Sequence, residues 1–84
     1  GTIYGRGIMN SSEAVIKRIN DLCFEKRMSY YALAYRSAIP KSTLMNIING
    51  TNPTVSTLNK ICNGFEMSLM DFFQDECFEF CEED

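Results

Sequence analysis

Residues 30–50 read YYALAYRSAIPKSTLMNIING, and their apolar positions do not fit one continuous helix. Leu33 and Ala34 share one helical register, whereas the apolar residues from Ile39 onward follow a new one. A change of register within so few residues indicates that a turn separates two short helices. We therefore predict a helix that starts near residue 30, a tight turn at residues 37–39, and a second helix directly after it.

The second of these helices has recognisable ends. Pro40 suits its first turn, because the N–H that proline lacks would have no intrahelical partner there. Gly50 suits the left-handed conformation of a C-terminal cap. A mostly polar face then remains outside the core, made of Lys41, Ser42, Thr43, Met45, Asn46 and Asn49. Amide, hydroxyl and lysine side chains of this kind can pair with base edges and phosphates in a major groove.

The sequence resembles the helix-turn-helix domains of the phage repressor and Cro-like (XRE) family. The resemblance rests on SYYALA at residues 29–34, IPKSTL at residues 39–44 and NIING at residues 46–50, and it covers roughly residues 13–73. It implies an all-α fold, a compact five-helix domain like that of lambda repressor, with the helix-turn-helix at helices two and three. Ala38 departs from the family, which usually has glycine at this turn to allow a positive φ angle.

The resemblance also implies a function. It predicts a transcriptional regulator, a repressor, that binds double-stranded DNA sequence-specifically. Its third helix would read the major groove. Position in the motif assigns base reading to Lys41, Ser42, Thr43, Met45 and Asn46, and backbone contact to Tyr30, Asn49, Thr51 and Asn52. The alternative role for Tyr30 is that of an ordinary surface tyrosine without a DNA contact. The competing function is a protein-interaction module, such as an antitoxin-like or antirepressor partner that keeps the fold.

The net charge of −3 is unevenly distributed along the chain. Residues 26–65 carry five basic side chains and no acidic one, whereas residues 67–84 carry seven acidic side chains and no basic one. A local positive face attracts phosphate over a Debye length of about 8 Å, whatever the total charge. The charge pattern therefore permits DNA binding, although short basic stretches can also be merely solvated.

Several classes of function are disfavoured by the composition. The 84 residues provide for one small domain, and they include no histidine, no glycine-rich phosphate loop and no nucleophile–base pair. We therefore expect no enzyme, no catalytic residue, no cofactor and no small-molecule substrate. No apolar run approaches the roughly 18 residues of a membrane span, so we expect a cytoplasmic protein without membrane contact.

The four cysteines do not have the pattern of a secreted disulfide framework. Cys23 and Cys62 occupy apolar positions of predicted helices and are expected to be buried thiols. Cys77 and Cys81 are four residues apart, but a zinc site would need further ligands and the chain has no histidine. We expect no metal site.

The other helices follow from apolar periods and capping residues. We expect one over residues 13–27, capped by Ser11 or Ser12, with Val15, Ile16, Ile19, Leu22 and Cys23 inward and Lys17, Arg18, Asp21 and Glu25 outward. Ser29 should cap the helix over residues 30–36, and Thr54 one over residues 55–63 with Val55, Leu58, Ile61 and Cys62 inward. A fifth helix should start after Ser68.

The chain is predicted to divide into three parts. Residues 1–8 are expected to be an artificial extension or a disordered arm, and residues 9–75 to be the helix-turn-helix domain. Residues 76–84 form an acidic tail that either continues helix five or is extended. An apolar surplus at the end of this small chain predicts a homodimer, and the residues concerned are Phe72, Phe73, Cys77, Phe80 and Cys81.

Overall fold

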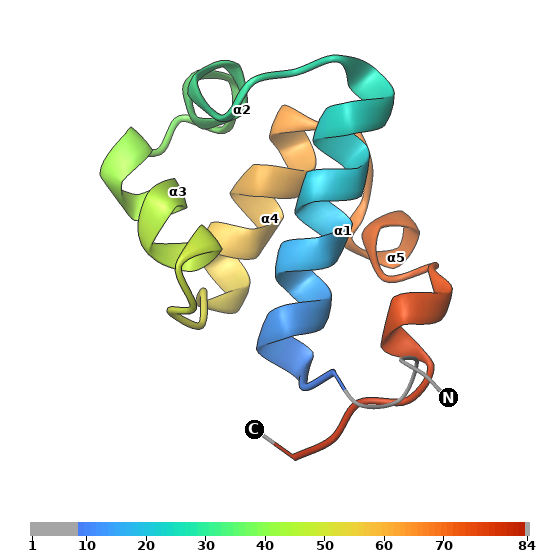
Figure 1. The fold of residues 1–84 in the computed structure, drawn as a ribbon. Coiled ribbons are helices and arrows are strands. Elements are labelled where there is room, and N and C mark those ends of the chain that lie inside the picture. Colours follow the sequence, from blue (N-terminus) through green and yellow to red (C-terminus); the bar gives the residue numbers. More distant parts are fainter. Residues whose placement is uncertain (1–8, 84) are drawn as a thin grey trace.

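The apolar periods of the sequence correspond to helices in the computed structural model, which describes residues 9–83. The elements in Figure 1 are α1 (Ser11–Lys26), α2 (Tyr30–Ser37), α3 (Lys41–Ile48), α4 (Val55–Gly64), α5 (Leu69–Phe72) and the 3-10 helix η1 (Glu76–Phe78). The predicted all-α, five-helix architecture is confirmed. The expectation for residues 1–8 lies outside the described residues.

One apolar core holds these elements together. Helix α2 packs against α3 and α4, α4 also packs against α5, and η1 packs against α1. The largest side chains with less than 2% exposure are Phe65, Phe72, Ile19, Leu33, Leu44, Ile61 and Cys62. In Figure 1, α2 and α3 lie on one side of α4, and α5 lies on the other. The helix-turn-helix and the C-terminal segment therefore occupy opposite sides of the domain.

Helix α1 begins earlier than the sequence predicted. Its N-cap is Asn10, whose Oδ1 accepts the N–H of Glu13 at 2.8 Å, while the N–H of Asn10 donates to Oε1 of Glu13 at 3.0 Å. This reciprocal capping box satisfies two N–H groups at once. The prediction that Ser11 or Ser12 caps this helix is therefore wrong. The three other predicted caps are confirmed, each accepting a backbone N–H at 3.0 Å, and they are Ser29, Thr54 and Ser68.

Two residues lie on the opposite side of their helix from the one predicted. Arg18, expected to face solvent, is 8% exposed, because its guanidinium reaches the C-terminal end of α5. Val55, expected in the core, is 74% exposed. It is the first residue of α4, where the helix starts beyond the edge of the core.

The acidic tail does not continue helix five. Helix α5 ends at Phe72, and Asp75 then adopts an extended conformation, with φ −154° and ψ 147°. The Asp75 carboxylate accepts the N–H of Cys77 at 3.0 Å and starts η1. Further on, the N–H of Glu82 donates to the carbonyl of Met9 at 3.1 Å. The end of the tail thus lies beside the residues that precede α1.

Candidate nucleic-acid interface

The turn between α2 and α3 sets the angle at which α3 leaves the domain. Ala38 is in the left-handed region, with φ 58° and ψ 40°, and the N–H of Ile39 returns to the carbonyl of Ala34 at 3.1 Å. The turn thus places a positive φ on a residue with a Cβ, which costs about 1 kcal/mol. Pro40 lies one position earlier than expected, as the N-cap of α3, and its carbonyl accepts the N–H of Thr43 at 3.0 Å.

Helix α3 has one buried and one outward face. Leu44 and Ile47 are 0% and 2% exposed and fix the helix against the core. Of the five residues predicted to read bases, Lys41, Ser42 and Asn46 are exposed, whereas Thr43 and Met45 are half-buried. The structure thus brings the exposed three together on the outer face of one short helix. None of them has to leave the core to reach a ligand.

The loop after α3 holds three of the four predicted backbone contacts. Asn49 is the C-cap of α3, and Gly50 has a φ of +116°, a conformation that favours glycine. The N–H of Thr51 donates to the carbonyl of Asn46 at 2.9 Å. Asn49, Thr51 and Asn52 are all exposed. This loop therefore presents short polar side chains directly beside the outer face of α3.

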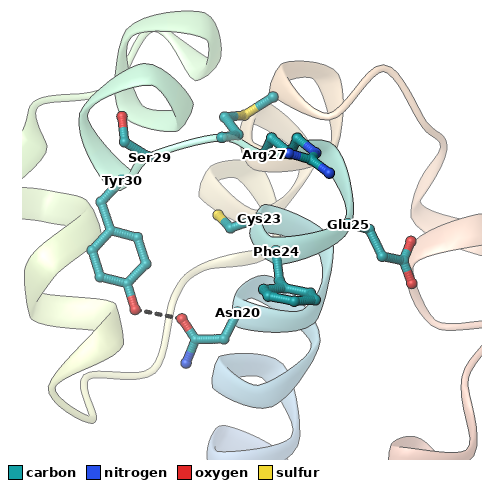
Figure 2. A pocket seen from close by; sticks show the side chains of 8 residues that line it. Asn20, Cys23, Phe24, Glu25, Arg27, Ser29 and Tyr30 are labelled. Atoms are coloured by element: carbon teal, nitrogen blue, oxygen red, sulfur yellow. Dashed lines mark hydrogen bonds between the residues drawn. The ribbon is translucent and has the colours of Figure 1, made fainter.

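Tyr30 is not a freely exposed surface tyrosine. It is half-buried, its ring packs against the core, and its hydroxyl donates to Oδ1 of Asn20 on α1. Figure 2 shows this bond at one side of an open groove between α1 and the start of α2. Asn20 is exposed and was not among the predicted site residues. Nothing in the apolar period of α1 distinguishes it from other outward polar residues.

An ion pair on α1 neutralises the acidic side chain of Asp21. Lys17 and Asp21 pair at 2.6 Å on α1, and this hydrogen bond raises the pKa of Lys17. The acidic segment around η1 packs against α1 beside α5, and the end of the tail returns to the residues before α1. Lys41 stands exposed at the start of α3. The acidic segment around η1 therefore lies on the side of the domain away from α3.

The buried cysteines are structural. Burial raises the pKa of Cys62 to about 11 and that of Cys77 to about 12, so both thiols are neutral near pH 7. The Cys77 thiol donates to the carbonyl of Ala14 at 3.6 Å. Within residues 9–83 there is no cluster of metal-ligating side chains. In the same part of the chain, no helix combines the length and apolar character of a membrane span.

Comparison with known proteins supports this view of the fold. Residues 18–77 match the sequence model of the Cro/C1-type helix-turn-helix DNA-binding domain. The chain belongs to this family. It is a DNA-binding transcriptional regulator of helix-turn-helix type and not an enzyme, and the predicted XRE resemblance is confirmed. A search of curated proteins found no match.

Solved structures agree with the family assignment. The crystal structure of the wild-type restriction-modification controller protein C.Esp1396I is 31% identical with a TM-score of 0.69, and the alignment covers 75% of this chain and 83% of that one. A single-residue mutant of the same protein is also 31% identical, with a TM-score of 0.73 over 84% of this chain and 94% of that one. The similarity therefore extends over most of both chains.

Proposed function

We propose that this regulator binds double-stranded DNA sequence-specifically and acts as a repressor, with α3 inserted in the major groove. The observation that carries the proposal is the division of α3 into a buried face, at Leu44 and Ile47, and an exposed polar face. A helix anchored in this way can present side chains to base edges without losing its place in the core. Similarity to a restriction-modification controller protein supports a role in gene control.

The proposed division of roles follows the positions of the side chains. Lys41, Ser42 and Asn46 read bases directly, because lysine and amide side chains match the acceptors and donors of the major groove. Thr43 and Met45 are half-buried and contribute apolar contact at the edge of the same surface. The other predicted site residues contact the DNA backbone and fix the register of α3 on the duplex. They are Tyr30, Asn49, Thr51 and Asn52.

Substitution of the exposed residues of α3 tests base reading. Lys41→Ala and Asn46→Ala should each weaken binding to the preferred DNA site by roughly 1–3 kcal/mol and relax preference at one base position. Both side chains are exposed, so the melting temperature should not change appreciably. Fluorescence anisotropy with the preferred duplex and its single-base variants measures both effects. Asn63→Ala, at an exposed position of α4, is the matched control, and unchanged affinity in either test variant removes that residue from the reading surface.

The preferred site itself can be obtained by selection from a random duplex pool. A salt titration with random duplex then distinguishes the two functions considered for this fold. Phosphate contacts release counterions, so affinity for DNA must fall steeply with salt, whereas a protein-interaction module would show no DNA binding to titrate.

We further propose that the regulator acts as a homodimer. One domain offers few base contacts, and two-fold symmetry would place two α3 helices about 34 Å apart on one face of the duplex. Of the apolar residues that motivated a dimer, Phe72 and Cys77 are buried within their own domain and cannot contact a partner. Exposed apolar side chains remain on the same segment at Met70, Phe73 and Phe80, which are 76%, 43% and 60% exposed. We call these three residues the C-terminal apolar surface and assign the dimer contact to it.

Charge substitution tests the dimer and its location. Met70→Glu should shift the chain to monomer at tens of micromolar, because it would place two carboxylates in an apolar two-fold contact. Phe24→Glu is the matched control, since Phe24 is 86% exposed and lines the groove between α1 and the start of α2. Sedimentation velocity measures both. A wild-type chain that sediments only as monomer with and without DNA contradicts the dimer, and dissociation by Phe24→Glu alone would move the interface to α1.

A further inference from the structure

The bond between Tyr30 and Asn20 orients an amide on the surface. Tyr30 donates its only hydroxyl hydrogen to Oδ1 of Asn20, so the Asn20 oxygen is engaged. A carboxamide held by its oxygen still has two N–H donors. In Figure 2 the Asn20 nitrogen is turned away from the phenol. The pair therefore presents N–H groups, not a phenol, beside the start of α2.

Asn20 lies along the edge of α1 that adjoins the helix-turn-helix. Two contacts define this edge. Ser12 donates to the carbonyl of Gly50 at 3.4 Å, in the loop assigned above to backbone contact, and Asn20 holds Tyr30 at the first residue of α2. Asn20 lies eight residues after Ser12, about 12 Å further along α1 and rotated by about 80° around its axis. Asn20 is thus on the same side of α1 as the proposed backbone contacts.

The charges around Asn20 do not repel an anion. Its neighbour Asp21 is paired with Lys17 at 2.6 Å, across one turn of α1. Arg27 lines the same groove as Asn20 and Tyr30, and its side chain is exposed. Glu25 also lines the groove, but Figure 2 shows its carboxylate directed away from Asn20. A phosphate oxygen near the amide would therefore meet N–H donors without an unpaired carboxylate beside it.

We infer that Asn20 is a further DNA-backbone contact, whose amide N–H donates to a phosphate oxygen, and that Tyr30 is its positioning residue. The inference rests on the proposed function, because it requires that α3 and its loop face the duplex. It also changes the role of Tyr30, which acts through Asn20 and not by its own donation to phosphate. Since phosphates carry no sequence information, the contact should strengthen binding to every duplex equally.

Asn20→Asp is the principal test. The new carboxylate still accepts from Tyr30 but repels phosphate, so affinity should fall about tenfold or more, by the same factor for the preferred site and for random duplex. Asn63→Asp is the matched control, because it adds the same charge at an exposed position of α4 that has no proposed contact. Its affinity should stay within about twofold of the wild-type value. Melting curves of both variants check that the fold is retained.

Two further variants separate a phosphate contact from a structural role. Asn20→Ala should weaken binding severalfold without changing the slope of log affinity against log salt, because a neutral amide displaces no counterion. Lys41→Ala should lower that slope by about one. Tyr30→Phe should weaken binding less than Asn20→Ala, and adding it to Asn20→Ala should cause no further loss.

The outcomes distinguish this inference from the function on which it rests. If wild-type protein binds DNA and Asn20→Asp binds as tightly as Asn63→Asp, the phosphate contact is wrong and the proposed function stands. A loss restricted to the preferred site would equally overturn it, since it would make Asn20 a base-reading residue. A wild-type chain that binds no duplex would overturn the proposed function itself. If Asn20→Asp failed to fold, Asn20→Ala would decide, because alanine is favoured at an exposed helical position.

Discussion

Arg18→Ala is expected to lower the free energy of unfolding by about 3 kcal/mol, although the apolar period of α1 predicts a surface position for this residue. Its guanidinium donates to the carbonyls of Phe72 at 2.6 Å and Asp71 at 2.8 Å, and it pairs with the carboxylate of Asp75 at 3.3 Å. Alanine would leave the last carbonyls of α5 without these donors and would remove a side chain that is only 8% exposed. For a domain of this size the melting temperature should fall on the order of 15 °C.

Urea unfolding followed by circular dichroism measures this loss, at one chain concentration because dimerisation would add to stability. Lys17→Ala is the control from the neighbouring position. It breaks only the half-exposed pair with Asp21, and the change should stay below about 1 kcal/mol. Equal effects of the two substitutions would show that the buried contacts of Arg18 do not stabilise the native state beyond those of a surface pair.

The same contacts give stability a defined pH dependence. The N–H of Cys77, aided by the cation of Arg18, holds the pKa of Asp75 below its ordinary value of 3.8. Because the native pKa is the lower one, the contribution of Asp75 is present above pH 3.8 and is lost as pH falls through the native pKa. Near neutral pH this carboxylate is therefore fully able to cap η1 and pair with Arg18.

Local chemistry explains which features could be predicted from the sequence. The break in register after Ala34, the proline and the terminal glycine determined α2 and α3 almost to the residue. Caps at Ser29, Thr54 and Ser68 were predictable because a hydroxyl three residues before a helical N–H is a local signal. The outer face of α3 follows from the same period, so its exposed residues could also be named in advance.

The features that were missed depend on contacts between distant parts of the chain. Arg18 is buried because it caps α5, more than fifty residues later, and no period within α1 reveals that partner. The end of α5 depends on Asp75, whose carboxylate starts η1 in place of a longer helix. Asn20 is tied to the start of α2 by its hydrogen bond with Tyr30, ten residues later in the chain. Such tertiary hydrogen bonds override the local propensities on which a sequence prediction relies.

The close crossing of α2 and α4 requires glycine at position 64, and this contact fixes how α2 lies in the domain. A Cβ added to Gly64 would lie 2.2 Å from Oγ of Ser37, 3.1 Å from its backbone nitrogen and 3.3 Å from Cδ1 of Leu33. Ser37 is 3% exposed, and within residues 9–83 its hydroxyl has no hydrogen-bond partner. Gly64→Ala should therefore destabilise the domain by about 2–3 kcal/mol, as overpacking does in other cores, despite the better helix propensity of alanine.

A double-mutant cycle with Ser37→Ala separates this overlap from other effects. Ser37→Ala alone should be neutral or slightly stabilising, because it removes a buried hydroxyl that has no partner. In the Gly64→Ala background it removes the 2.2 Å contact and should restore most of the lost stability, which gives a coupling energy of about 1–2 kcal/mol. Strictly additive effects would contradict the steric cause. DNA affinity should follow the same order, because a displaced α2 moves the start of α3 away from the position in which its polar face meets the groove.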